Sequence, residues 1–383
     1  MILPHKHNKK AFAGKGLVFL KKYGRWLVLA LLLALMAGLG AHGVKTYLLY
    51  SKEPAQPAVI KVGELERSLL GLPHYVALAQ GFYREQNLQV TSFVLDKSTQ
   101  ADLQLSNRAD VYLGNLCQAV FTRPLGTGAE LVALAGLARL EGSFLLGRQI
   151  NQPFTWNSLK KKSILGDAPD SQANIVLEEA LRQNKLALQH QVIIIQNLPP
   201  DLKEGAFEAG VGHFVQLPEP QATFTEQKGF GQKAVFLGGA VNPIPSLALL
   251  APPAYPAEHS RQCQQLVNGL CKGLLWLDYH SAAEAAKAVA RYFPELDHQT
   301  LTGIIDQYKK LGLWGKSPLI GQPEYESLQL YVKKAGELSN PVSYQDGVYA
   351  KFAKKAAKTV EYVPPSRQQE KTWWEKLKTL DFK

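Results

Sequence analysis

Residues 72–90 read LPHYVALAQGFYREQNLQV, and this stretch predicts one helix followed by one strand. Pro73 suits the first turn of a helix, where its missing N–H is no loss. Asn87 can adopt the left-handed conformation that ends a helix, and an extended run begins at Leu88. Apolar side chains recur at helical spacing and would share one face: Tyr75, Val76, Ala79 and Phe82.

The same stretch resembles a known family. The order Pro-x-Tyr-Val-Ala, then Gly-Phe-Tyr, then Asn-Leu-x-Val is similar to the opening of the solute-binding proteins that serve ABC importers for nitrate, sulfonates, taurine and thiamine precursors. Further similar motifs lie near residues 108–114, 163–184 and 211–229, and the resemblance covers residues 58–340. It implies an α/β fold of the periplasmic-binding-protein type II class, with two lobes and a ligand held between them.

The body of the chain alternates apolar strand-like runs with helical patterns, which favours parallel α/β sheets. On the resemblance, the first lobe comprises residues 59–145 and 246–345, and the second lobe comprises residues 146–245. Ser143–Leu146 would carry the chain into the second lobe, and two strands at Ala234–Leu237 and Ser246–Leu250 would return it. Helices are expected at residues 172–184, 257–279, 281–292, 298–311 and 322–337. Two crossings would let the lobes close on a ligand by hinge motion.

The N-terminus carries a membrane signal. Residues 1–25 form a basic cytoplasmic leader, and residues 26–44 are almost entirely apolar. We expect an uncleaved membrane anchor that holds the protein at the extracytoplasmic face of the cell membrane. The alternative is a cleaved signal peptide, which would leave the protein in the periplasm. Residues 45–58, with two prolines, read as a linker to the first lobe.

The positive charge lies at the two ends of the chain. The net charge is +11, yet residues 53–350 carry a net charge of −3, so a nucleic acid is not an expected partner. Residues 346–383 form a basic tail with an amphipathic helical pattern at residues 371–380. That helix would lie on anionic lipid or pack on its own lobe.

The chain shows no catalytic or cofactor-binding motif, so we do not expect an enzyme. Its three cysteines, Cys117, Cys263 and Cys271, do not form a disulfide framework. Cys263 and Cys271 are too far apart along one helix to pair, at about 12 Å. We expect all three to be small buried side chains.

Ligands in open α/β sheets bind beyond the carboxyl ends of the strands, and that rule selects a set of loops. The candidate ligand-binding residues in these loops are Arg67, His74, Asn115, Ser143, Asp167, Asp170, Ser171 and Glu219. Some have a structural alternative. Asp170 or Ser171 could simply cap the helix at residue 172, His74 could be a buried structural histidine, and Glu219 could orient its helix.

Carboxylates outnumber cations among the residues expected near the ligand. The cations are Arg67 and Arg139, and the carboxylates are Glu64, Glu141, Asp167, Asp170 and Glu219. Because an acidic site repels anions, a neutral or cationic nitrogen compound is favoured, such as a pyrimidine-type thiamine precursor. The resemblance implies the permease and ATPase subunits of an ABC importer as partners. The alternatives are a sulfonate, taurine or nitrate ligand, or a membrane-anchored sensor or scaffold ectodomain without transport.

Overall fold

The computed structural model describes Met36 and residues 56–95, 108–117, 121, 131–148, 150, 153–338 and 341–364. The predicted leader, the apolar segment 26–44 apart from Met36, most of the linker and the tail helix lie outside the described residues. Among the helices that the structure describes, none combines the length and the apolar character needed to span a membrane.

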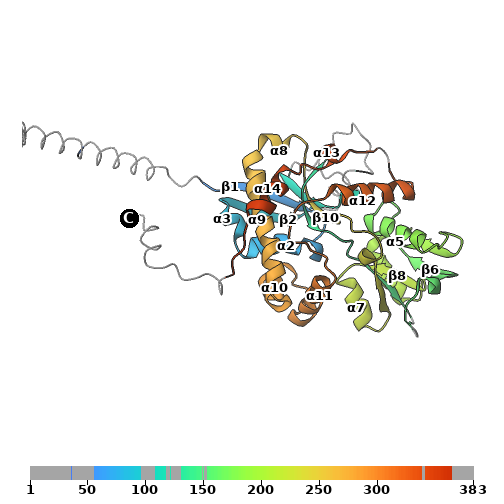
Figure 1. The fold of residues 1–383 in the computed structure, drawn as a ribbon. Helices are drawn as coiled ribbons and strands as arrows, with labels where there is room; N and C mark the ends of the chain where they lie inside the picture. The colour runs from blue at the N-terminus through green and yellow to red at the C-terminus, as the bar shows by residue number, and fades with distance from the viewer. Residues whose placement is uncertain are drawn as a thin grey trace, which may run out of the picture. The chain divides into compact units, whose positions relative to one another are not determined.

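The first of two sheets has five strands in the order β2-β1-β3-β10-β4. They are β1 (Ala58–Glu64), β2 (Leu88–Val94), β3 (Val111–Gly114), β4 (Val132–Ala138) and β10 (Leu247–Ala251). Strands β1, β2 and β10 of this sheet are labelled in Figure 1. Strand β1 runs parallel to β2 and β3, whereas β10 runs antiparallel to β3 and β4.

The second sheet also has five strands, in the order β7-β6-β8-β5-β9. They are β5 (Phe144–Gly147), β6 (Lys162–Leu165), β7 (Val192–Ile195), β8 (Phe214–Leu217) and β9 (Gln232–Phe236). Strand β6 runs parallel to β7 and β8, and β5 runs antiparallel to β8 and β9.

The prediction of parallel sheets is therefore confirmed only in part, because both sheets are mixed. Strands β5 and β10 are the ones that enter a sheet from the other sheet, and each enters against the direction of its neighbours. The prediction that Ala234–Leu237 returns to the first lobe is wrong, because β9 pairs with β5, Phe236 lying opposite Phe144. The chain thus crosses between the sheets at residues 139–143 and 237–246.

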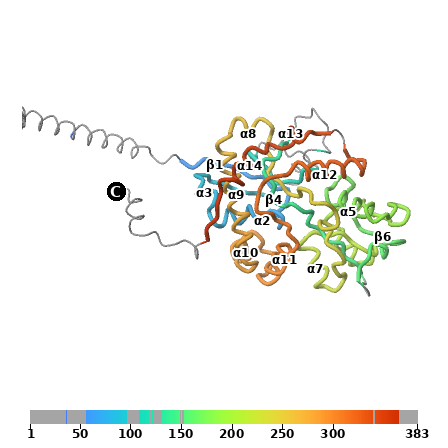
Figure 2. The backbone as a smooth tube through the Cα atoms, in the orientation of Figure 1, coloured from blue at the N-terminus to red at the C-terminus, as the bar shows by residue number. Residues whose placement is uncertain are grey.

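Helices and short 3-10 turns (η) surround the two sheets (Figure 2). They are η1 (Leu69–Gly71), α2 (Leu72–Ala79), α3 (Phe82–Glu85), η3 (Trp156–Leu159), α5 (Gln172–Gln183), α6 (Pro200–Glu208), α7 (Gln221–Gln227), η4 (Leu237–Gly239), α8 (Tyr255–Glu258), α9 (Ser260–Tyr279), α10 (Ala282–Val289), η5 (Ala290–Tyr292), α11 (His298–Lys310), α12 (Gln322–Ala335), α13 (Tyr344–Gly347) and α14 (Lys351–Thr359). The five helices expected from the sequence are confirmed, although the one at 257–279 begins as the separate helix α8.

The opening stretch forms two helices instead of one. Gly81 has a φ of 76°, in the left-handed region that favours glycine, and it separates α2 from α3. Asn87 has a φ of 57°, which confirms the left-handed conformation expected at the end of the helical segment. Pro73 lies in the first turn of α2, as predicted.

Helix α9 packs tightly on α2, and this contact fixes the start of the first lobe. A Cβ atom on Gly273 of α9 would lie 2.3 Å from the carbonyl oxygen of Pro73 and 3.2 Å from the Cβ of Ala77. Cys263 and Cys271 of the same helix are buried and unpaired, as is Cys117, which confirms that they form no disulfide.

Gly273→Ala should destabilise the fold by about 2 kcal/mol, because the added methyl group overlaps the backbone of α2. Gly303→Ala is the matched control, since a Cβ atom there would meet no atom within 4 Å in helix α11. That change should stabilise the protein by up to about 1 kcal/mol through helix propensity. Urea unfolding of both variants checks the pair, and equal midpoints would contradict the packing described here.

Candidate functional site

The loop between β4 and β5 buries a carboxylate where the chain crosses between the sheets. The backbone N–H of Ser143 donates to both carboxylate oxygens of Glu141, at 3.1 and 3.0 Å, and the Ser143 hydroxyl donates at 2.6 Å. Burial raises the pKa of Glu141, the negative charge of Asp167 raises it further, and the hydrogen bonds from Ser143 oppose both effects. Tyr308 of α11 donates to the Gly142 carbonyl at 2.7 Å.

Amide side chains of the second sheet join this loop. Nε2 of Gln216, on β8, donates to the Ser143 hydroxyl and to the Ala173 carbonyl, both at 2.8 Å. Nε2 of Gln172, in the first turn of α5, donates to the Pro245 carbonyl at 2.9 Å, in the second crossing. We call this group the sheet junction. It consists of Glu141, Gly142, Ser143, Gln172, Gln216 and Pro245.

The loop before α5 brings two predicted residues close to the junction. Ser171 is the N-cap of α5, and its hydroxyl accepts from the Asn174 N–H at 3.1 Å. Asp170 therefore does not cap the helix, and its carbonyl oxygen accepts from the Cys117 thiol at 3.4 Å. This contact joins the segment after β3 to the second sheet. The prediction left the choice of cap open, and the structure assigns it to Ser171.

Two loops from different sheets carry interacting carboxylates. Asp167, after β6, forms an ion pair with Lys203 of α6, whose side chain is buried. Glu66, after β1, has an exposed side chain, but partial loss of hydration raises its pKa. The charge of Asp167 raises that pKa further, and the charge of Lys203 lowers it. Glu66 and Asp167 therefore lie close enough for their charges to interact.

Glu219 is buried and already has partners for its charge. Its Oε1 lies 2.6 Å from Nζ of Lys233, and its Oε2 accepts from the Thr223 N–H at 3.1 Å, in the first turn of α7. The same lysine contacts Oε1 of Gln307 in α11 at 3.0 Å. This geometry matches the structural alternative, in which Glu219 orients its helix.

His74 is buried, and both of its ring nitrogens have internal partners. Nδ1 lies 2.8 Å from the Tyr83 hydroxyl, and Nε2 lies 3.0 Å from the Ser92 hydroxyl. Since Ser92 donates its proton to Glu64, Nε2 carries the hydrogen that Ser92 accepts. The structure thus gives His74 the structural role, and we do not carry its predicted ligand contact further.

Two predicted residues lie near the first-sheet loops. Arg67 is exposed, its Cζ lies 6.0 Å from the ring centre of Tyr292, and its charge acts on His74 and Tyr75. Asn115 is half-buried directly after β3. The hydrogen bonds that define the sheet junction do not include Arg67 or Asn115.

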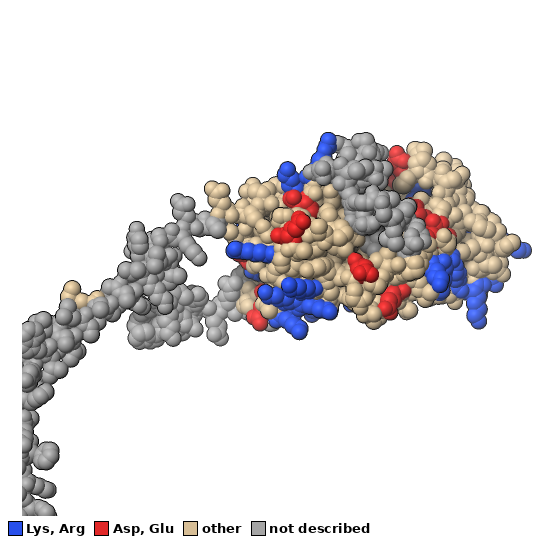
Figure 3. Space-filling view, turned by 90° about the horizontal axis from the view of Figure 1, so that it is seen from above, with Lys and Arg blue, Asp and Glu red and all other residues tan. Residues whose placement is uncertain are grey.

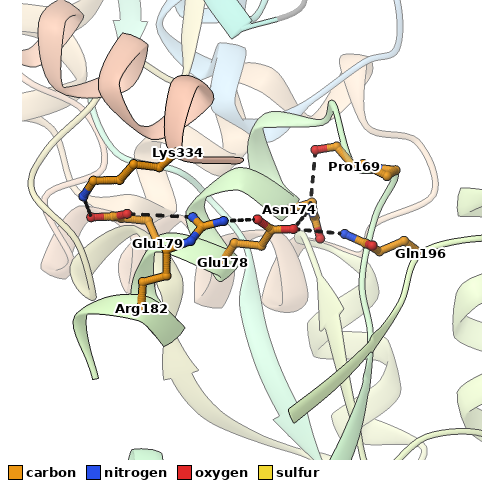
Figure 4. A network of polar contacts seen from close by, with 7 residues as sticks. All are labelled: Pro169, Asn174, Glu178, Glu179, Arg182, Gln196 and Lys334. Atoms are coloured by element: carbon orange, nitrogen blue, oxygen red, sulfur yellow. Dashed lines mark hydrogen bonds and ion pairs between the residues drawn. The ribbon is translucent and has the colours of Figure 1, made fainter. Parts of the chain in front are cut away.

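A polar network connects α12 to the first turn of α5 (Figure 4). Nζ of Lys334 lies 2.7 Å from Oε1 of Glu179, and Arg182 lies between Glu179 and Glu178. Oε1 of Glu178 accepts from Nδ2 of Asn174 at 3.1 Å. The network ends at the Gln196 amide and the Pro169 carbonyl. It therefore fixes the loop that carries Asp167 and Asp170.

Sequence reasoning missed four polar residues that the structure brings into this region: Glu66, Gln172, Lys203 and Gln216. Gln216 had a usable signal, because it is the polar residue in the apolar run Phe-Val-Gln-Leu of β8. Glu66 looks like an ordinary solvated loop residue, and Lys203 has no sequence signal for burial. In the described part of the chain, no group of three His, Cys, Asp or Glu side chains could hold a metal ion.

Comparison with known proteins identifies the class. No model of a protein family matches the sequence. The chain is 30% identical over 299 residues to the Bacillus subtilis (strain 168) protein named "Putative binding protein YtlA", across 77% of this chain and 89% of that one. The two mixed sheets with their surrounding helices form a periplasmic-binding-protein fold.

Two solved structures share this fold. The ligand-binding component of an ABC-type import system from Staphylococcus aureus, with zinc bound, has a TM-score of 0.63 at 17% identity, covering 78% of this chain and 99% of that chain. The alkanesulfonate-binding protein SsuA from Xanthomonas axonopodis pv. citri, bound to MOPS, has a TM-score of 0.60 at 15% identity, covering 77% and 99%. The chain belongs to the family of ABC-type solute-binding proteins, which confirms the resemblance found in the sequence.

The buried imidazole of His74 makes stability depend on pH. Burial lowers the pKa of His74 from 6.5 to about 3, so only the unfolded chain takes up a proton as the pH falls below 6.5. Stability should be full above that pH and fall by about 1.4 kcal/mol per pH unit toward pH 3. His74→Gln should lose this dependence. Urea midpoints at pH 7.5 and 5 test it, and parallel losses in both proteins would contradict it.

Proposed function

We propose that this protein captures a small organic solute between its two sheets and delivers it to the permease and ATPase subunits of an ABC importer. Membership of the family supports this function. Polar groups from both sheets and both crossings meet at the sheet junction, so a solute bound there would be contacted from two sides. Hinge motion of the two sheets about the crossings would admit and enclose it.

The carboxylates around the sheet junction favour a neutral or cationic nitrogen compound, such as a pyrimidine-type thiamine precursor. The charge of Asp167 acts on both Glu66 and Glu141, while Lys203 pairs with Asp167 and also acts on Glu66. Glu219 does not add to the excess charge, because Lys233 neutralises it. A partly buried site with an excess of negative charge binds cations and repels anions. This observation carries the proposal for the ligand.

A sulfonate or nitrate ligand is the second candidate. Arg67 favours it, since its guanidinium is exposed in the loop after β1 and suits oxyanions. The Xanthomonas protein of the same fold is named for alkanesulfonate binding. The charge of Arg67 acts on His74 and Tyr75, however, and is not among the charges that shift the pKa of Glu66 or Glu141. We therefore favour the nitrogen compound.

The apolar segment 26–44 would hold the binding unit at the extracytoplasmic face of the membrane, close to its permease. Residues 45–58 would serve as the linker. Determining the N-terminus of the native protein tests the anchor. We expect an intact N-terminus in the membrane fraction, and a soluble chain that begins near Val44 would show cleavage instead.

Glu66→Gln should weaken binding of a cationic probe such as benzamidine by about tenfold, because one carboxylate charge is lost. Acidification from pH 8 to 5 should weaken binding to the wild type, since the raised pKa of Glu66 means protonation at a higher pH than usual. Glu85→Gln is the control, a surface carboxylate paired with Lys272. Isothermal titration calorimetry measures both effects. Tighter binding of taurine than of benzamidine by the wild type would reverse the choice of ligand class.

A further inference from the structure

Four buried amide oxygens have no hydrogen-bond partner among the described residues. One is Oε1 of Gln221 in α7, and the other three belong to side chains that lie in the first turn of α5 or are bonded to it. These three are Oε1 of Gln172, Oδ1 of Asn174 and Oε1 of Gln216. All three side chains are at least nine-tenths buried, and two of them belong to the sheet junction. Leaving a buried acceptor without a donor destabilises a fold, because the group loses its hydration and gains no hydrogen bond in return. Such a cost concentrated in one small region needs an explanation.

The orientation of each amide is fixed by its nitrogen. Nε2 of Gln172 donates to the Pro245 carbonyl, and Nε2 of Gln216 donates to the Ala173 carbonyl. Nδ2 of Asn174 donates to the Pro169 carbonyl. Since a carbonyl can only accept, turning any of these amides by 180° would place two oxygens against each other. The groups without partners are therefore acceptors.

The neighbouring groups at the junction are also acceptors. The carboxylate of Glu141 accepts from Ser143, and the Ser143 hydroxyl gives its only proton to that carboxylate. The Ser143 oxygen in turn accepts from Gln216. The Ser143 hydroxyl proton, both N–H donors of Gln216 and one N–H of Gln172 are used inside the protein, whereas acceptor capacity remains on the two glutamines. A ligand that satisfies this set must supply N–H or O–H groups.

Asn174 differs from the two glutamines in its surroundings. Its amide belongs to the network that joins α5 to Lys334, and its oxygen lies close to the backbone of Gly166. A Cβ atom built on Gly166 would be 3.2 Å from Oδ1 of Asn174. We therefore assign Asn174 to the support of the loop and restrict the inference to Gln172 and Gln216.

We propose that Gln172 and Gln216 determine specificity by accepting hydrogen bonds from a ligand with at least two N–H donors, such as an amidine or an aminopyrimidine. This inference rests on the proposed function and deepens it. Sulfonate and nitrate groups offer only acceptors, so each glutamine oxygen would stay unpaired in their complexes. Sites that leave buried polar groups unpaired with the wrong ligand discriminate strongly against it.

The test uses Gln172→Met and Gln216→Met in the full chain, with Gln183→Met on the same helix as the matched control. Methionine keeps the approximate volume and removes the acceptor. The probes are benzamidine and 4-aminopyrimidine, with ethanesulfonate and nitrate for comparison because neither carries an N–H donor, and binding is measured by isothermal titration calorimetry. Thermal unfolding of each variant is recorded without any probe.

We expect Gln183→Met to bind each of the two N–H probes with the same affinity as the wild type. Gln172→Met and Gln216→Met should each weaken binding at least tenfold, while the melting temperature of Gln172→Met stays equal to or above that of the wild type. A rise in melting temperature with unchanged probe affinity would mean that the oxygens are only unpaired structural groups, and it would overturn the inference. If Gln216→Met does not fold, Gln172→Met decides.

Two further outcomes separate this inference from the proposed function. Binding of ethanesulfonate or nitrate without binding of either N–H probe overturns the specificity assignment and leaves solute capture intact. Binding of none of the four probes also overturns the assignment to amidines and aminopyrimidines. The proposed function has its own test, which is independent of the four probes. It fails if a solute recovered from an extract of the host cells contacts only one of the two sheets, because the proposal is capture between both.

Discussion

The carboxylate of Glu141 and the backbone N–H of Ser143 bind each other at the point where the chain passes from one sheet to the other, and the arrangement of the site depends on this contact. The Ser143 carbonyl accepts from the Leu237 N–H at 3.0 Å, so the outgoing and returning segments are joined. Gly238 lies directly on the first crossing, because a Cβ atom there would be 2.0 Å from the Glu141 carbonyl oxygen. The two crossings therefore form one packed unit that holds a negative charge between the sheets.

The hydrogen bonds from Ser143 offset only part of the cost of burying the Glu141 carboxylate, whose pKa stays raised, and further contacts pack around this loop. Tyr308 holds the carbonyl of Gly142, and its ring stacks near Phe144, with 6.1 Å between the ring centres. Lys233 lies 5.0 Å from the centre of the Phe144 ring and neutralises Glu219. On the face seen in Figure 3, acidic and basic side chains are interspersed.

Local features of the sequence predicted much of the fold. The spacing of Tyr75, Val76 and Phe82 gave the apolar face of the first helical segment, and all three side chains are buried. The break at Gly81 could not be predicted, because glycine is compatible with a continuous helix. Packing against α9 decides it, since a Cβ atom on Gly269 would lie 2.5 Å from the Tyr83 ring. The direction of β9 likewise depends on its pairing with β5, which is distant in sequence.

The site was predictable where it follows from loop position. Ser143, Asp167 and Ser171 lie after strands or before helices, and sequence alone placed them near the ends of the strands. Gln172 and Gln216 could not be recognised in the same way, because their roles depend on which carbonyl each amide nitrogen reaches across the fold. For His74 the sequence left a ligand contact and a structural role both open. The hydrogen bonds of its two ring nitrogens to Tyr83 and Ser92 match the structural alternative.

The most direct test of this account is a crystal structure of the protein purified under native conditions with the solute that it retains. The account predicts a nitrogen compound enclosed between the two sheets, with N–H groups within hydrogen-bond distance of the Gln172 and Gln216 side-chain oxygens and positive charge toward Glu66, Glu141 and Asp167. A sulfonate or nitrate bound to Arg67, or a solute that contacts only one sheet, would contradict it.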